Sequence, residues 1–269
     1  MNMRAVLREA AGTQVESMLV HADALRLRYG EVEAVGGVSL AIESGEFVSL
    51  LGPSGCGKSS ILRAIAGLVP VAGGELRIAG GPPGEGAGLQ IGMMFQKPLL
   101  LPWRTTLENV QLPVEIAMHS GSHVGRVERQ LAMDLLRIVG LADFADAYPH
   151  QLSGGMQQRA ALARTLMSDP DILLLDEPFG ALDEFTRETL NEELLSIWRS
   201  GRTRLKAIVM VTHSIPEAVA MSDRIIVLGP RPARLLDVVA VRLPHPRDPA
   251  DPGFARMLGQ VRTAARPKS

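Results

Sequence analysis

The stretch Gly52-Pro53-Ser54-Gly55-Cys56-Gly57-Lys58-Ser59-Ser60 decides how the rest of the chain is interpreted. From Gly52 to Ser59 it fits the phosphate-binding pattern G-x-x-x-x-G-K-[ST]. The apolar residues 46–51 before it indicate a buried strand, and residues 60–67 after it indicate a helix that a glycine ends. Strand, glycine loop and helix N-terminus form a nest of backbone N–H groups that favours phosphate. We therefore expect Lys58 to bridge the outer phosphates of a nucleotide and the Ser59 hydroxyl to ligate Mg²⁺.

Length and composition indicate one large α/β domain, or one domain that carries an inserted subdomain. The chain has 269 residues, of which 46% are hydrophobic and 21% charged. The net charge of −1 and the 4% aromatic content argue against a nucleic-acid-binding body. The single cysteine, Cys56, excludes a disulfide within the chain and suits a reducing compartment. We interpret it as a small residue that fills a tight loop rather than as a reactive thiol.

Nothing in the sequence predicts a segment that crosses a membrane. No apolar run reaches the roughly 18 residues that a spanning helix needs. Residues 1–17 lack the apolar core of a signal peptide and carry acidic residues. We expect them to be a poorly ordered extension, and the protein to be cytoplasmic unless a partner holds it at a membrane.

The order of patterns predicts an α/β fold with an inserted helical part. Apolar alternation predicts strands between residues 19 and 42, with turns at Gly30 and at Gly36-Gly37. Helical spacing dominates from residue 97 to about 169, where Thr106 is the expected cap of a helix over 107–118. The expected domains are an α/β nucleotide-binding core over 18–97 and 166–243, a helical subdomain over 98–165 and a tail over 244–269. Further strands are predicted at 73–81, 91–95, 172–175, 207–211, 224–228 and 235–243, and further helices at 124–138, 156–167, from about 184 to Gly201, and 254–265.

Polar side chains follow three of the predicted buried strands. Gln96 follows 91–95, Asp176 and Glu177 follow 172–175, and His213 comes soon after 207–211. The carboxyl ends of strands are where α/β sheets keep ligand-contacting groups. Asp176 is then placed to hold Mg²⁺ through water, Glu177 to orient or deprotonate an attacking water, and His213 to reach a γ-phosphate. The alternatives are a solvated strand end, a structural histidine and a loop glutamine.

Two further features allow both a binding and a structural interpretation. An exposed Tyr29 can stack on a nucleotide base or be an ordinary strand-edge tyrosine. Ser153-Gly154-Gly155 precedes a helix, so it can be a second phosphate site or an ordinary helix cap. Taken alone, the cap is the simpler interpretation.

In this order the motifs resemble the ATP-binding subunit of an ABC transporter over about residues 19–243. The resemblance implies a P-loop NTPase core with a mostly parallel central sheet, an N-terminal antiparallel β subdomain and an inserted α-helical subdomain. It also implies a homodimer on ATP binding, in which two head-to-tail copies share ATP and Mg²⁺, and ATP hydrolysis coupled to transport.

The resemblance implies a role for each motif. Tyr29 would stack on adenine, Gln96 would touch Mg²⁺ and the attacking water, Glu177 would be the general base, and His213 would steady the γ-phosphate. Asp183 would cross the dimer interface. The phosphates would be held by Gly52, Pro53, Ser54, Gly55, Cys56, Gly57, Lys58, Ser59 and Ser60, and from the other copy by Ser153, Gly154 and Gly155. Ser59, Gln96 and Asp176 would be the Mg²⁺ ligands.

A narrower likeness is to the nitrate, sulfonate and taurine importer branch. It rests on Leu100-Leu101-Pro102-Trp103-Arg104-Thr105, on Met156 and on Pro244-His245-Pro246-Arg247-Asp248. Met156 stands where the commonest form of the family signature has glutamine, and Ala233 where this branch has glycine. Pro102-Trp103 would lie at the groove that receives a coupling helix of the membrane subunit, unless Trp103 is a buried residue that fills the subdomain.

The likeness implies the partners and the location. The chain would be peripheral, at the cytoplasmic face of the inner membrane, with integral membrane permease subunits and, indirectly, a solute-binding protein; no nucleic acid is expected. The alternatives are a soluble ABC-type ATPase that acts on nucleic acid or the ribosome, and a non-hydrolysing regulatory subunit.

Overall fold

The computed structural model describes residues 18–84, 88–118, 125–180, 182–201 and 203–266, so the expected extension over 1–17 lies outside it. The chain divides into two compact units. The first, called here the core unit, comprises Met1–Leu89 and Lys206–Ser269. The second, the inserted unit, comprises Gln90–Leu205. Within the described ranges no helix has the length and apolar character needed to cross a bilayer.

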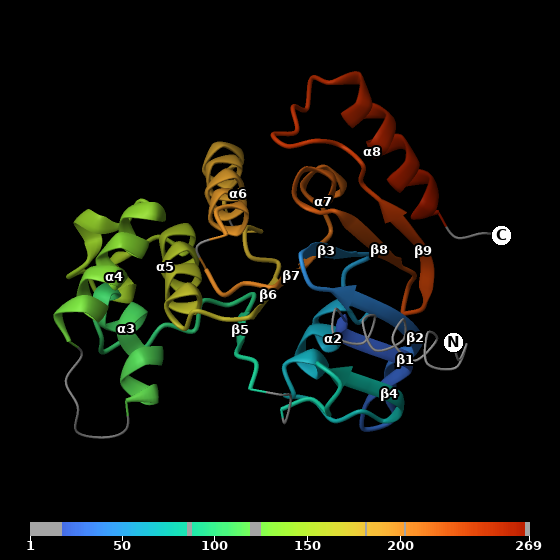
Figure 1. The fold of residues 1–269 in the computed structure, drawn as a ribbon, viewed down its shortest axis with the longest axis horizontal. Coiled ribbons are helices and arrows are strands. Elements are labelled where there is room, and N and C mark those ends of the chain that lie inside the picture. The colour runs from blue at the N-terminus through green and yellow to red at the C-terminus, as the bar shows by residue number, and fades with distance from the viewer. Residues whose placement is uncertain (1–17, 85–87, 119–124, 181, 202, 267–269) are drawn as a thin grey trace, which may run out of the picture. The chain divides into compact units, whose positions relative to one another are not determined.

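An antiparallel sheet forms the N-terminal part of the core unit. Its strands are β1 (Met18–Tyr29), β2 (Val32–Glu43) and β4 (Gly73–Ile78), in the order β2-β1-β4. In β1, Leu25 and Leu27 are buried while Arg26 and Arg28 are exposed, which is the alternation of a sheet with one covered face. The sheet confirms the antiparallel part of the predicted fold class (Figure 1).

The turn predicted at Gly36-Gly37 is wrong, because both glycines lie inside β2. The strand pairing passes from Leu25↔Val38 to Arg26↔Gly36 and so leaves Gly37 without a paired residue. Gly37 has φ +91°, which a residue with a side chain rarely adopts. The two glycines therefore mark a β-bulge, which a sequence pattern does not distinguish from a turn.

The core unit also holds a mostly parallel set of strands. These are β3 (Glu46–Leu51), β7 (Ala207–Thr212), β8 (Arg224–Leu228) and β9 (Leu235–Ala240). β3 pairs in parallel with β7 and β8, and β9 is antiparallel to β8 at one edge. All residues of β7 are buried, as expected for a strand that is covered on both faces. β9 ends at Ala240, earlier than the predicted 243.

The segment after β9 folds back onto the core unit. The predicted helix over 254–265 is present as α8 (Pro252–Ala264), and it packs beside α7 (Ile215–Met221) (Figure 1). Phe254 and Val261 of α8 are buried in a cluster with Leu51 and Val219. The C-terminal segment therefore completes the core on the outer side of α7.

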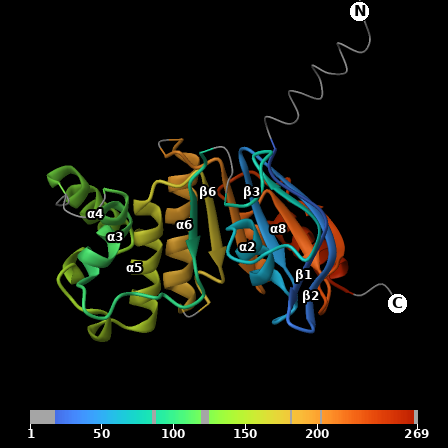
Figure 2. The same ribbon diagram turned by 90° about the horizontal axis from the view of Figure 1, so that it is seen from below.

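The described residues of the inserted unit form a parallel strand pair and four α-helices. β5 (Ile91–Met94) pairs in parallel with β6 (Ile172–Asp176). Helices α3 (Thr106–Ala117), α4 (Arg126–Ile138) and α5 (Gly154–Met167) pack against one another, as Figure 2 shows. The remaining helix is α6 (Glu184–Arg199), and two short 3₁₀ turns cover Ala142–Phe144 and Pro149–Gln151.

The cap of α3 is Thr105 and not the predicted Thr106. The Thr105 hydroxyl accepts from the Glu108 N–H at 3.2 Å, and the Glu108 carboxylate accepts from the Thr105 N–H at 2.7 Å. This reciprocal pair is a capping box. Thr106 is instead buried, and its hydroxyl donates to the carbonyl of Ala147 at 2.8 Å. Either of the two adjacent threonines could cap the helix by its residue type. The Thr106 hydroxyl binds the carbonyl of Ala147 instead, and Thr105 is the cap.

We predict that Phe254→Ala lowers the free energy of unfolding by about 3 kcal/mol or more, because it leaves a cavity between α8 and the rest of the core unit. Arg256→Ala, at an exposed position of the same helix, should change it by no more than about 0.5 kcal/mol. Urea unfolding of the full chain, followed by circular dichroism, compares the two. Equal unfolding midpoints would show that α8 is not part of the core.

Candidate active site

The phosphate-binding pattern lies between β3 and α2 (Lys58–Ile65). The N-cap of α2 is Gly57, with φ +125°, and no side chain caps the helix. No acidic residue lies in the first turn. Because the first N–H groups of a helix have no partner within the helix, an uncapped N-terminus is a binding place for an anion.

The backbone of neighbouring strands lies so close to the loop that two of its positions, Gly52 and Gly57, have no room for a side chain. A Cβ on Gly57 would lie 2.5 Å from the carbonyl oxygen of Ala34, in β2. A Cβ on Gly52 would lie 2.7 Å from the carbonyl oxygen of Leu228, in β8. These distances are too short for any real Cβ, so this loop shape requires glycine at both positions.

Lys58 and Tyr29, two of the residues that the sequence analysis assigned to nucleotide binding, both contact this loop. The Lys58 ammonium donates to the carbonyls of Gly52 at 2.7 Å and Pro53 at 2.8 Å, and the residue is only 4% exposed. The Tyr29 hydroxyl donates to the Ser60 hydroxyl at 3.3 Å, while the residue stays 43% exposed. The loop therefore has a positive charge inside its bend and an accessible aromatic ring beside it.

His213 follows β7, the parallel neighbour of β3. Because Leu51 pairs with Thr212, Gly52 and His213 leave the sheet at the same edge. His213 is exposed, and the residues on either side of it are held by α7. The Ser214 N–H donates to the Thr212 hydroxyl at 3.0 Å, and the Ser214 hydroxyl accepts from the Glu217 N–H at 3.3 Å. The parallel register thus brings the histidine and the start of the phosphate loop to one edge.

The inserted unit brings a second group of candidate residues together. Met94 pairs with Leu175, so Gln96 and Glu177 leave β5 and β6 at the same edge. The Gln96 amide donates to the Glu177 carboxylate at 3.2 Å. Glu177 has φ +47°, a left-handed conformation that is costly for a residue with a side chain. Asp176, one residue earlier, is buried at the end of β6.

Ser153 and Asp183 each cap a helix in the inserted unit. Ser153 accepts from the Met156 N–H at 3.2 Å at the start of α5, as the simpler sequence interpretation predicted. Asp183 accepts from the Thr186 N–H at 3.0 Å at the start of α6, and this hydrogen bond lowers the pKa of Asp183. Both residues are exposed. The Ser153 hydroxyl accepts in the cap, so its hydrogen can still be donated to a ligand.

One residue that the sequence interpretation missed holds the segment after Gln96. Arg164, on α5, donates to the carbonyls of Pro98 at 2.7 Å and Leu99 at 2.8 Å. Burial lowers the pKa of its guanidinium. A charged residue in the middle of an otherwise buried stretch of α5 was the available signal.

Comparison with known proteins gives consistent results over most of the chain. A family model described as ABC transporter matches residues 35–180. The taurine import ATP-binding protein TauB of Rhizobium johnstonii is 46% identical over 233 residues, which cover 86% of this chain and 85% of that protein. The aliphatic sulfonates import ATP-binding protein SsuB 1 of Pseudomonas syringae pv. syringae is 43% identical over 228 residues, which cover 84% of this chain and 87% of that protein.

Solved structures give the same answer for the fold. The dimeric structure of MJ0796, a bacterial ABC transporter cassette, has a TM-score of 0.74 and 35% identity, and covers 84% of this chain and 100% of its own. A post-hydrolysis dimer of the same cassette, bound to ADP and Pi, has a TM-score of 0.73 and 34% identity, with the same shares of both chains covered. The chain therefore belongs to the ABC transporter family and has the fold of its ATPase cassettes.

Proposed function

We propose that this chain is the ATP-binding and ATP-hydrolysing subunit of an importer for a small, anionic solute such as nitrate, a sulfonate or taurine. The observation that carries the proposal is the similarity to the taurine and aliphatic sulfonates import proteins, which extends over 84–86% of the chain. The solute itself meets other subunits, so the residues described here act on ATP.

In the core unit, Tyr29 stacks on adenine, residues 52–60 hold the phosphates and His213 steadies the γ-phosphate. The uncapped N-terminus of α2 and the buried ammonium of Lys58 support this assignment. His213 needs only to donate or accept a hydrogen bond at the edge where the loop begins. Cys56 is buried in the loop, which supports its interpretation as a small filling residue.

In the inserted unit, Glu177 is the general base that orients and deprotonates the attacking water, and Gln96 positions that water. The hydrogen bond from Gln96 and the left-handed backbone of Glu177 support this pair, since strained residues cluster at active sites. Positioning and charge stabilisation supply most of the rate in phosphoryl transfer.

Mg²⁺ would be the metal that accompanies ATP. Among the described residues, no group of three or more His, Cys, Asp and Glu side chains could hold a metal. Ser59, Gln96 and Asp176 would instead offer hydroxyl, amide and carboxylate oxygens, and Mg²⁺ bound with nucleotides keeps few protein ligands. The ion would neutralise charge on the β- and γ-phosphates.

Two copies of the chain would form a head-to-tail homodimer around ATP. Ser153, Gly154 and Gly155 of one copy would bind the γ-phosphate held by the other, and Asp183 would cross the interface. The two structures of the cassette MJ0796 compared above are both dimeric. The exposed positions of Ser153, Gly154 and Asp183 leave these residues available to a second copy.

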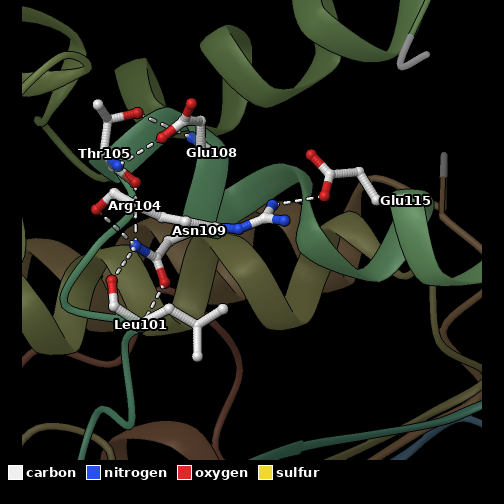
Figure 3. A network of polar contacts seen from close by, with 6 residues as sticks. All are labelled: Leu101, Arg104, Thr105, Glu108, Asn109 and Glu115. Carbon is white, nitrogen blue, oxygen red and sulfur yellow. Dashed lines mark hydrogen bonds and ion pairs between the residues drawn. The ribbon is translucent and has the colours of Figure 1, made fainter.

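A rigid loop before α3 supplies the surface for the membrane partner. Asn109, which is buried, accepts from the Leu101 N–H at 2.7 Å and donates to the carbonyls of Leu101 at 3.1 Å, Arg104 at 3.1 Å and Thr105 at 3.0 Å (Figure 3). The loop that Asn109 holds presents Trp103, which is 70% exposed, so the alternative of a buried tryptophan is wrong. A rigidly held, exposed tryptophan is a typical anchor for a partner.

We propose that this surface binds a cytoplasmic helix of an integral membrane permease. The surface belongs to a helical subdomain over 98–165. The chain would then be a peripheral protein at the cytoplasmic face of the inner membrane and would meet a solute-binding protein only indirectly. The alternative of a soluble ATPase on nucleic acid or the ribosome requires a basic surface, and the net charge of −1 gives it no support.

Uptake by cells tests the importer directly. Uptake is measured for three labelled solutes, namely taurine, an alkanesulfonate and nitrate. Deletion of the gene should abolish the uptake of one of them, and the wild-type gene should restore it. Unchanged uptake of all three would contradict the assignment to this branch. Purification of the tagged chain from membranes should recover a permease, whereas recovery of ribosomes or nucleic acid would favour the alternative.

We predict that Lys58→Met weakens ATP binding by about 10- to 100-fold, because it removes a charge-assisted contact to the phosphates. Arg63→Met, which removes a cation from the last turn of the same helix, should leave the affinity unchanged. Titration of the full chain with a fluorescent ATP analogue measures both. Equal affinities of Lys58→Met and wild type would exclude this loop as the nucleotide site.

We predict that Glu177→Gln keeps ATP affinity but slows hydrolysis by roughly 10²- to 10⁴-fold, the usual contribution of a general base. Glu193→Gln, at an exposed position of α6, is the matched control and should hydrolyse ATP at the wild-type rate. A phosphate-release assay gives both rates. Wild-type turnover in Glu177→Gln would refute the role of Glu177, and no phosphate release by the wild type would favour a regulatory subunit.

We predict that Trp103→Ala weakens binding to the permease by about 2 kcal/mol or more, as loss of a central aromatic anchor does. ATP affinity of the isolated chain should stay unchanged, since the proposal assigns the nucleotide phosphates to residues 52–60 and not to this loop. Leu235→Ala, at an exposed apolar position of β9, serves as the control. Co-purification with the permease in detergent, at graded concentrations, distinguishes the two variants.

A further inference from the structure

A buried arginine holds the far end of the helix that follows His213. Arg247 lies in the segment between β9 and α8, and its side chain is only 2% exposed. One terminal nitrogen donates to the carbonyls of Val219 and Ser222, each at 2.7 Å. Its Nε donates to Leu243 at 3.1 Å, and the other terminal nitrogen to Val241 at 3.4 Å.

These contacts cap the C-terminus of α7 from a distant part of the chain. The last carbonyls of a helix have no partner within the helix, and the negative end of the helix dipole favours a cation there. A buried guanidinium is costly unless its donors are used, and Arg247 uses them on backbone carbonyls. The guanidinium of Arg247 therefore finds acceptors in the carbonyls at the end of α7, and these carbonyls find a donor in the guanidinium.

The other end of α7 is fixed by the turn that contains His213. The Thr212 hydroxyl hydrogen-bonds the Glu217 carboxylate, and Ser214 caps the helix. α7 has seven residues, so it is about 10 Å long, and a displacement of one end moves the other. His213 is thus attached to a short rigid helix that Arg247 holds at its opposite end.

The end of α7 that Arg247 holds is also tied to the strand that leads into the phosphate loop. The Asp223 carboxylate accepts from the Phe47 N–H, at the start of β3, at 2.9 Å. The Ser222 and Ser49 hydroxyls share a hydrogen bond of 2.5 Å in the core. Ser222 and Asp223 therefore join the end of α7 to the strand of the phosphate loop, and Arg247 contacts both of them, through the Ser222 carbonyl and an ion pair of 3.9 Å with Asp223.

We propose that Arg247 is a positioning residue for ATP hydrolysis, which sets the location of His213 relative to the phosphate loop through α7. The proposal rests on the proposed function, in which His213 steadies the γ-phosphate. A misplacement of about 1 Å at a reacting group can cost about 10²-fold in rate, so the effect should appear in kcat. Nucleotide binding depends on residues 52–60 and should be preserved.

The test compares Arg247→Lys and Arg247→Met with Arg242→Met, which removes an arginine at an exposed position of the same segment. Lysine keeps the charge but has no planar fork to reach several carbonyls at once. We expect kcat to fall by about 10- to 100-fold in Arg247→Met and less in Arg247→Lys, with KM for ATP changed by no more than about twofold. Arg242→Met should match the wild type. An unchanged kcat in both Arg247 variants would overturn the proposal.

A double-mutant cycle separates positioning of His213 from general loss of structure. In a chain that already carries His213→Ala, Arg247→Lys should lower kcat no further, because the group that it positions is absent. A full additional loss would show that Arg247 acts elsewhere and would overturn the proposal. If His213→Ala alone keeps the wild-type kcat, it is the proposed role of His213 that fails.

A spectroscopic measurement covers the case in which Arg247→Met does not fold. In the full chain with ¹⁵N-labelled histidine, Arg247→Lys should shift or broaden the imidazole resonances of His213. Arg242→Lys should leave them in place. Unchanged resonances in a folded Arg247→Lys protein would contradict the coupling through α7.

Discussion

The structure depends on a helix N-terminus that must stay open. At the start of α2 the cap is a glycine, and no side-chain cap hydrogen bond closes this end of the helix. The backbone of Ala34 lies so close to Gly57, and that of Leu228 so close to Gly52, that neither position has room for a Cβ. β2 of the antiparallel sheet and β8 therefore limit which residues the loop can contain, and they also contribute to the core.

Parallel pairing explains how candidate site residues from distant parts of the sequence come to lie at the same end of neighbouring strands. In the core unit, the register of β3 and β7 brings Gly52 and His213 to one edge. In the inserted unit, the register of β5 and β6 does the same for Gln96 and Glu177. Glu177 keeps a strained backbone there because β6 before it is fully buried and the Gly180 N–H donates to its carbonyl at 3.3 Å.

Irregular segments near these groups are held by single polar side chains that bind several backbone groups. Asn109 does this for the loop that presents Trp103, Arg164 for the residues after Gln96, and Arg247 for the end of α7. Irregular backbone leaves carbonyls without partners, and one buried amide or guanidinium can satisfy several of them at once. Such segments can then be rigid without belonging to a helix or strand.

The sequence by itself determined the phosphate loop, the buried strands, most helices and the polar residues at strand ends. These follow from local patterns, namely glycine spacing, apolar runs and helical periodicity. Only the tertiary structure decided that Gly37 is a bulge, that Thr105 and not Thr106 caps α3, that Trp103 is exposed, and that residues after β9 complete the core. The position of Thr106 depends on the carbonyl of Ala147, and that of the residues after β9 on contacts such as those of Arg247 with α7. These partners lie more than 20 residues away, so a local sequence pattern cannot predict them.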